Sequence, residues 1–332
     1  MRSAKPLGLL ANYSEARRRK VVRELDAADS KRGVAKALRV LRIGYWFEYL
    51  RHRTRMCTAY GVGKHLQPEA YRKRHHGCVG DEHAKNCDGD HRNLWAKYAQ
   101  AIHAPSVETV LAVNHKVPGS ADVWSTMAWE AFDVEKPIGS CGDELLKRSP
   151  PAVQNAVYDG NALDHGRYRR RRSLRTTLGM LECHANLEGV AAMTILLREA
   201  HQASDPERCY DIGCSIHAAL LMATARNPVF GVRAELFEFF IRRVFPIASG
   251  KEIAFDVTAS ELSELTFQLQ NMILRLEDQG RIDLVTAGST RDVRKILRGQ
   301  FGFDLQYALG PRLRLLNTAE ESSEAARRVD AR

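Results

Sequence analysis

The sequence predicts a mainly α-helical, multi-helical fold, with a small unit of short helices near residue 100 and a larger helical C-terminal part. Apolar residues recur at helical intervals in most segments, whereas few segments alternate apolar and polar residues as strands do. A hydrophobic content of 44% over 332 residues is enough to build a core without disulfides. The chain therefore has room for two domains or for one large helical one.

Two basic helices are predicted within residues 1–60, one over 15–28 after Ser14 as N-cap and one over 34–54. Residues 1–76 hold 19 Lys and Arg against 6 Asp and Glu, whereas the whole chain carries a net charge of +10. Such a concentration of positive charge favours a polyanionic partner, nucleic acid first. The alternative is a solvated helix surface. The candidate phosphate contacts here are Arg17, Arg18, Arg19, Arg51, Arg53 and Arg55.

Glycines and prolines interrupt the pattern between residues 61 and 89, which predicts loops and short turns. Cys78, His83, Cys87 and His91 lie in and just after this stretch, and they supply the thiolates and imidazoles that tetrahedral zinc favours. No CxxC pair accompanies them, so the spacing is compatible with either a structural zinc or no cofactor. A metal-dependent enzyme would also need an open coordination position.

Three short helices are predicted after this stretch, over 90–99, from Pro105 to Val117, and over 121–132. The segment resembles the latter half of Cro/repressor-type helix-turn-helix domains. In those domains an aromatic residue near the end of the recognition helix is followed by a small residue, Pro-Ser and an amphipathic helix. Ala101 stands where glycine is usual. The matching residues are Tyr98, Ala101, Pro105, Ser106, Val107, Val110 and Leu111.

The resemblance implies that the helix over 90–99 enters the major groove of DNA. The side chains that would then meet base edges or phosphates are His91, Arg92, Asn93, Lys97 and Gln100. The alternative is a three-helix packing module with a hydrated polar face. Residues 61–135 are therefore expected to hold an irregular His/Cys loop and a helix-turn-helix-like unit. The segment is also similar to uncharacterised proteins of bacterial mobile elements and defence islands.

The C-terminal part is predicted as a helical domain over 150–318 with a flexible tail over 319–332. Core helices are expected over 179–203 and 212–226. Thr258 and Glu261 form a capping box before a helix that Gly280 ends, and a short strand over 282–285 and a helix over 289–299 follow. Asp211, Cys214 and His217 share one side of a predicted helix, and we interpret them as residues that flank the core.

A run of arginines near residue 170 is a second candidate for nucleic-acid contact, because guanidinium groups bind phosphate in a bidentate manner and stack on bases. The alternatives are a solvated helix start and an ion-pair partner for an acidic segment such as 320–324. The run consists of Arg167, Arg169, Arg170, Arg171, Arg172 and Arg175.

Seven cysteines, no secretory leader and no long uncharged apolar run indicate a cytoplasmic protein without a membrane partner. No phosphate-binding loop, GxSxG or HExxH motif is present, so a non-enzymatic role is favoured. The sequence thus predicts a nucleic-acid-binding protein, with duplex DNA favoured, that serves as a regulator or accessory factor of a bacterial mobile element or defence system. A helical interaction protein whose basic end docks an acidic protein partner is the competing class, and a homo-oligomer is compatible with either.

Overall fold

The computed structural model describes residues 5–27, 29–72, 94–283, 289–301 and 309–316. Most of these residues are helical, which confirms the mainly α fold class. The predicted tail over 319–332 lies outside the described residues.

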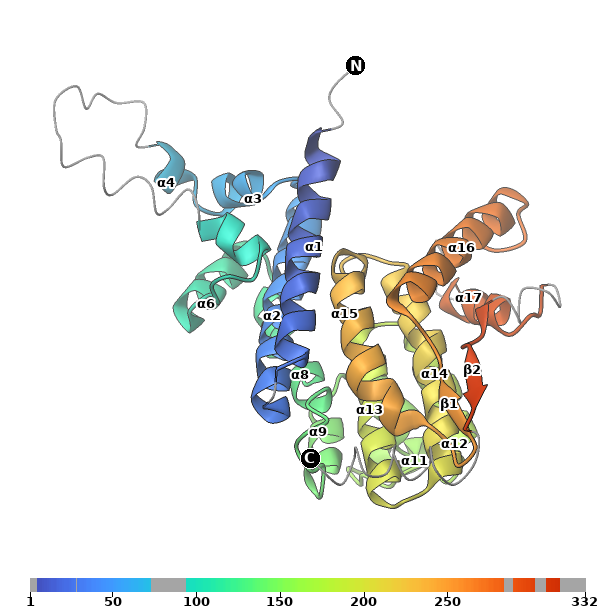
Figure 1. Cartoon of the computed structure of the whole chain (residues 1–332). Coiled ribbons are helices and arrows are strands. Elements are labelled where there is room, and N and C mark those ends of the chain that lie inside the picture. Colours follow the sequence, from blue (N-terminus) through green and yellow to red (C-terminus); the bar gives the residue numbers. More distant parts are fainter. Residues whose placement is uncertain (1–4, 28, 73–93, 284–288, 302–308, 317–332) are drawn as a thin grey trace, which may run out of the picture.

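The N-terminal part and the middle of the chain are built from short and long helices (Figure 1). Their bounds are α1 Lys5–Leu25, α2 Ser30–Thr54, α3 Ala59–Leu66, α4 Pro68–Arg72, a helix over 94–99, α6 Val107–Lys116, α7 Ser120–Ser125, α8 Ala128–Ala131, α9 Cys141–Lys147, α10 Pro151–Val157 and α11 Gly160–Asp164.

The C-terminal part contains the most deeply buried helices and two short strands. Its elements are α12 Leu174–His184, α13 Leu187–Gln202, α14 Pro206–Thr224, η1 Val229–Val232, α15 Arg233–Phe239, η2 Phe240–Val244, η3 Phe245–Ala248, β1 Ile253–Phe255, α16 Ala259–Asp278, α17 Ser289–Leu297 and β2 Leu313–Leu315. The strands pair antiparallel, with Ile253 opposite Leu315 and Phe255 opposite Leu313.

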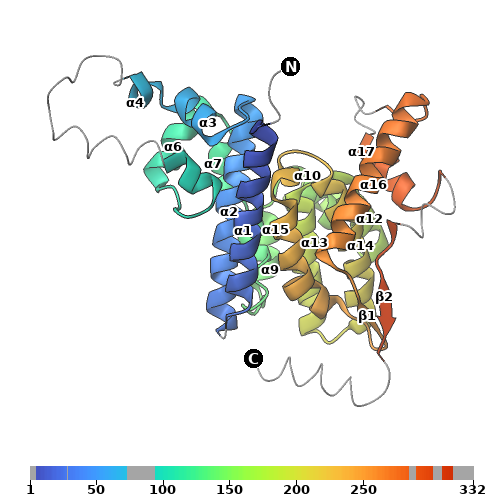
Figure 2. The same ribbon diagram turned by 45° about the horizontal axis from the view of Figure 1, so that its top comes forward.

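A large core joins the N-terminal helices to the C-terminal ones. It includes Val21 of α1, Leu41 of α2 and Phe237 of α15 as well as nearly the whole of α13. The helix α15 lies between α1 and α13 in two views (Figures 1 and 2). The basic helices of residues 1–60 therefore pack as part of the same body as residues more than 200 positions later.

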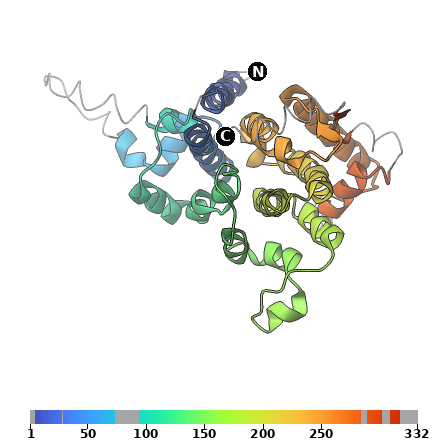
Figure 3. The ribbon, with the colours of Figure 1, turned by 60° about the horizontal axis from the view of Figure 1, so that its bottom comes forward.

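A second, smaller core lies around the C-terminal half of α2. It is centred on Trp46 and Trp95, whose rings stack with centroids 6.3 Å apart, and it includes Val62 of α3 and Val113 of α6. Figure 3 shows the α1–α2 pair in blue between these cyan and green helices on one side and the orange C-terminal helices on the other. We call the helices around this second core, α3, 94–99, α6, α7 and the end of α2, the Trp46 unit.

The prediction of loops over residues 61–72 is wrong, because α3 and α4 occupy them. Thr58 caps α3 by accepting a hydrogen bond from the Gly61 N–H at 3.0 Å. Gly63 is a packing residue rather than a turn residue, since a Cβ there would lie 2.5 Å from Trp95 and 2.2 Å from the Tyr71 hydroxyl.

Several helix bounds also differ from the prediction. The helix α1 begins at Lys5, and Ser14 lies inside it and donates to Glu235 Oε2 at 3.2 Å. The predicted helix over 179–203 is two helices, which break at Ala185 with a left-handed φ of 40°. The predicted helix over 121–132 is likewise split into α7 and α8, and α9 lies between the predicted units over 61–135 and 150–318.

The predicted helices at the C-terminal end agree better with the structure. Thr258 caps α16 by accepting from the Glu261 N–H at 3.2 Å, and Gly280 follows the helix with a φ of 64°. The helix α17 runs from Ser289 to Leu297 and Gly299 has a φ of 69°. Of the predicted strand over 282–285, the described residues 282 and 283 are not in a strand.

Candidate nucleic-acid interface

Part of the predicted interface lies outside the described residues. This holds for His91, Arg92 and Asn93 of the predicted recognition helix and for the predicted zinc ligands Cys78, His83, Cys87 and, again, His91. Within the described part of the chain, no group of three or more His, Cys, Asp or Glu residues is placed to hold a metal ion.

The described part of the predicted recognition helix, 94–99, packs one face into the Trp46 unit. Trp95, Tyr98 and Ala99 are buried, and the Trp95 indole donates to Gln67 Oε1 at 3.1 Å. Lys97 and Gln100 are half-buried, so they lie on the part of the surface that borders solvent. A short turn follows, in which Ala101 has a left-handed φ of 51°.

The helix after this turn is α6, which Ser106 caps by accepting from the Thr109 N–H at 3.2 Å. Val110 and Val113 face the small core, whereas Val107 and Leu111 are exposed. The helices 94–99, α6 and α7 therefore follow one another around a single apolar centre. The predicted third helix over 121–132 differs, because Trp129 and Phe132 in its second half belong to the larger core.

Arg17 is fully buried, so the prediction that it contacts phosphate is wrong. Its guanidinium donates to Glu235 of α15, to Glu48 of α2 at 3.3 Å, and to the carbonyl oxygens of Ala99 at 2.6 Å and Gly231 at 2.8 Å. Burial alone disfavours the charge, but the two carboxylates outweigh it and raise the pKa of Arg17 above its usual value. Arg17 is thus a structural cross-link between four segments.

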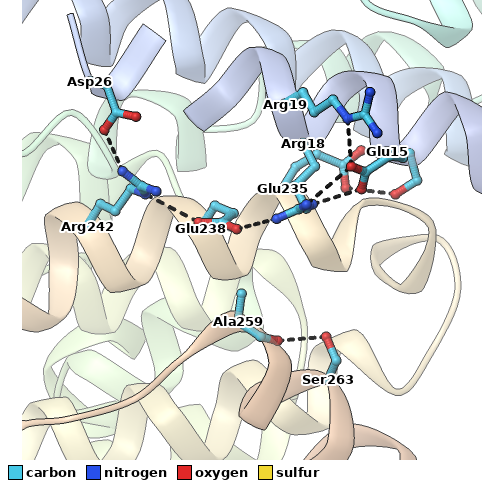
Figure 4. Close-up of polar contacts among 10 residues, drawn as sticks. Glu15, Arg18, Arg19, Asp26, Glu235, Glu238, Arg242, Ala259 and Ser263 are labelled. Atoms are coloured by element: carbon cyan, nitrogen blue, oxygen red, sulfur yellow. Dashed lines mark hydrogen bonds and ion pairs between the residues drawn. The ribbon is translucent and has the colours of Figure 1, made fainter. Parts of the chain in front are cut away.

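Arg18 and Arg19 pair with carboxylates along the contact of α1 with α15 (Figure 4). Arg18 lies between Glu15 at 2.9 Å and Glu238 at 2.7 Å, and Arg19 donates to Glu15 at 2.8 Å. Hydrogen bonds from these two arginines lower the pKa of Glu15 to about 2. Arg242 extends the row by bridging Asp26 and Glu238, so most of this charge is neutralised within the protein.

The end of α2 differs, because its basic side chains line an open cleft of about 430 Å³. Arg51, His52, Arg53 and Arg55 contribute to its walls together with Met56 and Cys57. Arg51 is partly buried and pairs with Glu48 at 2.7 Å. Arg53 and Arg55 are exposed, and no carboxylate among the described residues forms an ion pair with either. We call this site the α2 cleft.

Two of the six arginines in the second run pair with nearby acids. Arg170 bridges Asp143 and Glu199 at 3.0 Å each, and Arg169 pairs with Asp159 at 2.9 Å. The Arg171 side chain donates to the Asn155 carbonyl at 2.9 Å. Arg167, Arg172 and Arg175 are exposed, without an ion pair to the described chain.

This run also faces acidic residues across a cleft of about 650 Å³, namely Asp205, Glu207 and Asp211 of the α14 start. Such a mixed charge opposes a long polyanion. This run also lies far from the α2 cleft. The cleft is followed by α3 and the run is preceded by α11, and these two helices lie far apart in Figure 1. The predicted basic groups therefore do not form one surface.

The predicted link between the N-terminal charge and the recognition helix exists, but it is not a solvent-facing surface. Arg17 Nη1 donates to the Ala99 carbonyl and Lys20 Nζ donates to the Ala101 carbonyl, both at 2.6 Å. The sequence analysis did not identify Glu48 and Glu235, the carboxylates that hold Arg17 in this buried position. Glu48 and Glu235 each stand inside a strongly apolar run, and an acid in such a run signals a buried partner.

No helix in the described part of the chain is long and apolar enough to cross a membrane. A scan of protein-family models and searches of curated proteins and of solved structures found no match to the chain.

Proposed function

We propose that the protein binds nucleic acid, with duplex DNA preferred, and that the α2 cleft is its main phosphate contact. The observation that carries the proposal is the exposed pair Arg53 and Arg55 beside Arg51 and His52, in a cleft that no carboxylate of the described chain lines. Arginines that lack an internal partner can release counterions from DNA on binding, whereas those of α1 cannot without breaking existing ion pairs.

The Trp46 unit supplies the second support. Its small core joins the α2 cleft to the helix 94–99 through Trp46, Leu50 and Trp95. The left-handed backbone at Ala101 occurs where the helix-turn-helix resemblance expects glycine, the residue that adopts this conformation most readily. Lys97 and Gln100 then border the same unit as the α2 cleft and are the described candidates for base or backbone contact.

In this proposal the protein acts in the cytoplasm as a regulator or accessory factor of a bacterial mobile element or defence system. That role rests on the sequence resemblance alone. A structural zinc held by Cys78, His83, Cys87 and His91 remains a prediction from the sequence, and zinc content of the purified protein would test it.

The test is a titration of a labelled DNA duplex with the variant Arg53→Gln/Arg55→Gln. We expect about tenfold weaker binding and a fall of about 2 in the slope of log affinity against log salt, because two phosphate contacts are lost. The matched control is Arg167→Gln/Arg172→Gln, which removes two exposed arginines from the other end of the molecule and should bind DNA as the wild type does.

The competing class, docking of an acidic protein, would use the same cleft. Polyglutamate and duplex DNA of equal charge distinguish the two in a competition assay, since a nucleic-acid site prefers the regular phosphate spacing of the duplex. Equal competition, or no DNA binding by the wild type, would contradict the nucleic-acid proposal.

A further inference from the structure

A cleft of about 540 Å³ lies between α12, α14 and α17, away from the α2 cleft and outside the roles considered so far. Tyr210, Cys214 and His217 come from one side of α14, as the helical spacing predicts, and Glu182 comes from α12. The three helices lie next to one another in Figure 1. The volume falls within the range of about 300–1,000 Å³ that is typical of small-molecule sites.

His217 in the cleft wall is a buried polar group without a partner. It is 1% exposed, and no donor or acceptor of the described chain reaches its Nε2. Burial lowers the pKa of His217 to about 4, so the ring is neutral near pH 7. A buried nitrogen without a hydrogen bond costs free energy, and Nε2 exposes no surface to the cleft, so the neutral ring is part of the packed wall.

Arg294 of α17 and Arg298, which follows the end of α17, occupy the more exposed part of the same cleft. Arg294 and Arg298 both donate to a single carboxylate oxygen, Glu182 Oε2, with Arg298 at 3.1 Å. Each guanidinium has five N–H donors, and no other acceptor in the described chain bonds to either group. Among the described lining residues Glu182 is the one acid, so this part of the wall keeps one excess positive charge.

We propose that this cleft binds a small organic carboxylate. The carboxylate group joins Glu182 on the remaining donors of Arg294 and Arg298. Glu182 shows that the two arginines accept a carboxylate in this position. The Tyr210 ring, Ala218 and Leu297 supply the apolar contacts that such ligands need.

The experiment uses the full chain and two probes, benzoate and butyrate, with binding measured by ligand-observed NMR. We expect at least one probe to bind, and its neutral amide to bind about tenfold more weakly, because the amide lacks the charge that the arginines pair with. Arg298→Gln should weaken binding by a similar factor, whereas Arg291→Gln, in the adjoining helix α17 but outside the cleft, should leave it unchanged. Arg298 is 44% exposed at its side chain, so this variant keeps the fold.

A second readout locates the bound molecule. A saturating probe should slow the alkylation of Cys214 by iodoacetamide, followed by mass spectrometry, and leave the exposed Cys141 unaffected. Binding of neither carboxylate, equal binding of the amide, or unchanged binding by Arg298→Gln would overturn the proposal. These outcomes do not depend on whether the α2 cleft binds DNA.

Discussion

The arginines of α1 and those at the end of α2 both form clusters in the sequence, but they have opposite structural roles. Arg17 and Arg18 lie against Glu235 and Glu238 of α15 and hold two distant parts of the chain together. Arg53 and Arg55 project from the last turn of α2 or just after it and have no acidic partner in the described chain. The density of arginines in the sequence therefore does not distinguish a binding surface from an internal cross-link.

The difference follows from what each helix packs against. The helix α1 lies beside α15, whose sequence places Glu235 and Glu238 three residues apart and thus on one face. The end of α2 packs against α3 and the helix 94–99 through apolar side chains such as Trp46 and Leu50, and these helices offer no carboxylate to Arg53 or Arg55. An arginine is available for a partner only where the neighbouring helix presents no acid.

The largest expected effect on stability comes from removing the Arg17 cross-link. Arg17→Met should lower the free energy of unfolding by about 3–5 kcal/mol, because Glu235 stays buried without its arginine and Glu48 keeps only Arg51. Urea denaturation measures this loss. Arg19→Met, which removes an exposed arginine two positions away, should cost less than about 1 kcal/mol. The double variant Arg17→Met/Glu235→Gln should recover part of the loss, and equal losses in the two single variants would show that Arg17 is not the cross-link.

A smaller effect on stability is expected at Ala99 and Ala101, where the end of the helix 94–99 and the turn after it contact α1. Ala99 and Ala101 both accept hydrogen bonds from α1, but Ala99 is helical and Ala101 is left-handed. Ala99→Gly should cost about 2 kcal/mol, from lost helix propensity and one buried methyl group. Ala101→Gly should stay within about 0.5 kcal/mol of the wild type, because relief of the left-handed backbone offsets the same losses. Thermal unfolding of the two variants compares them directly, and a larger cost at Ala101 would contradict the assignment.

The helices could be predicted from sequence wherever capping and periodicity agreed, as in α16 after Thr258. They could not be predicted where a residue's conformation depends on a side chain distant in the sequence. Gly63 indicates a loop until Trp95 is known to pack on it, and Ala185 breaks a helix without the glycine that marks such a break. For the candidate site, the exposure of Arg53 and Arg55 is what a basic helix surface predicts, whereas the pairing of Arg51 with Glu48 was not predicted. The burial of Arg17 could not be predicted, since its carboxylates lie 31 and 218 residues away in the sequence.

The outer ion pairs of α1 should appear in the pH dependence of stability. Glu15 has a pKa lowered from 4.5 to about 2 in the folded protein. Its contribution is therefore present above pH 4.5 and is lost as the pH falls towards 2. Because the pair is largely solvated, we expect no more than about 0.5 kcal/mol. Glu15→Gln should lower the free energy of unfolding at pH 7 by this amount, and the free energy should then fall by that much less between pH 4.5 and 2. An unchanged pH dependence in this range would show that the pair contributes nothing.

The smallest effect on stability is expected where the effect on binding is largest. Arg53→Gln/Arg55→Gln removes two exposed cations that make no ion pair in the described chain, so the free energy of unfolding should change by less than about 0.5 kcal/mol. High salt should also distinguish the two regions. It should weaken DNA binding at the α2 cleft, but it should screen the buried Arg17 cross-link much less. A marked loss of stability in this variant would mean that the α2 arginines, like those of α1, serve the fold, and the assignment of the cleft to a partner would fail.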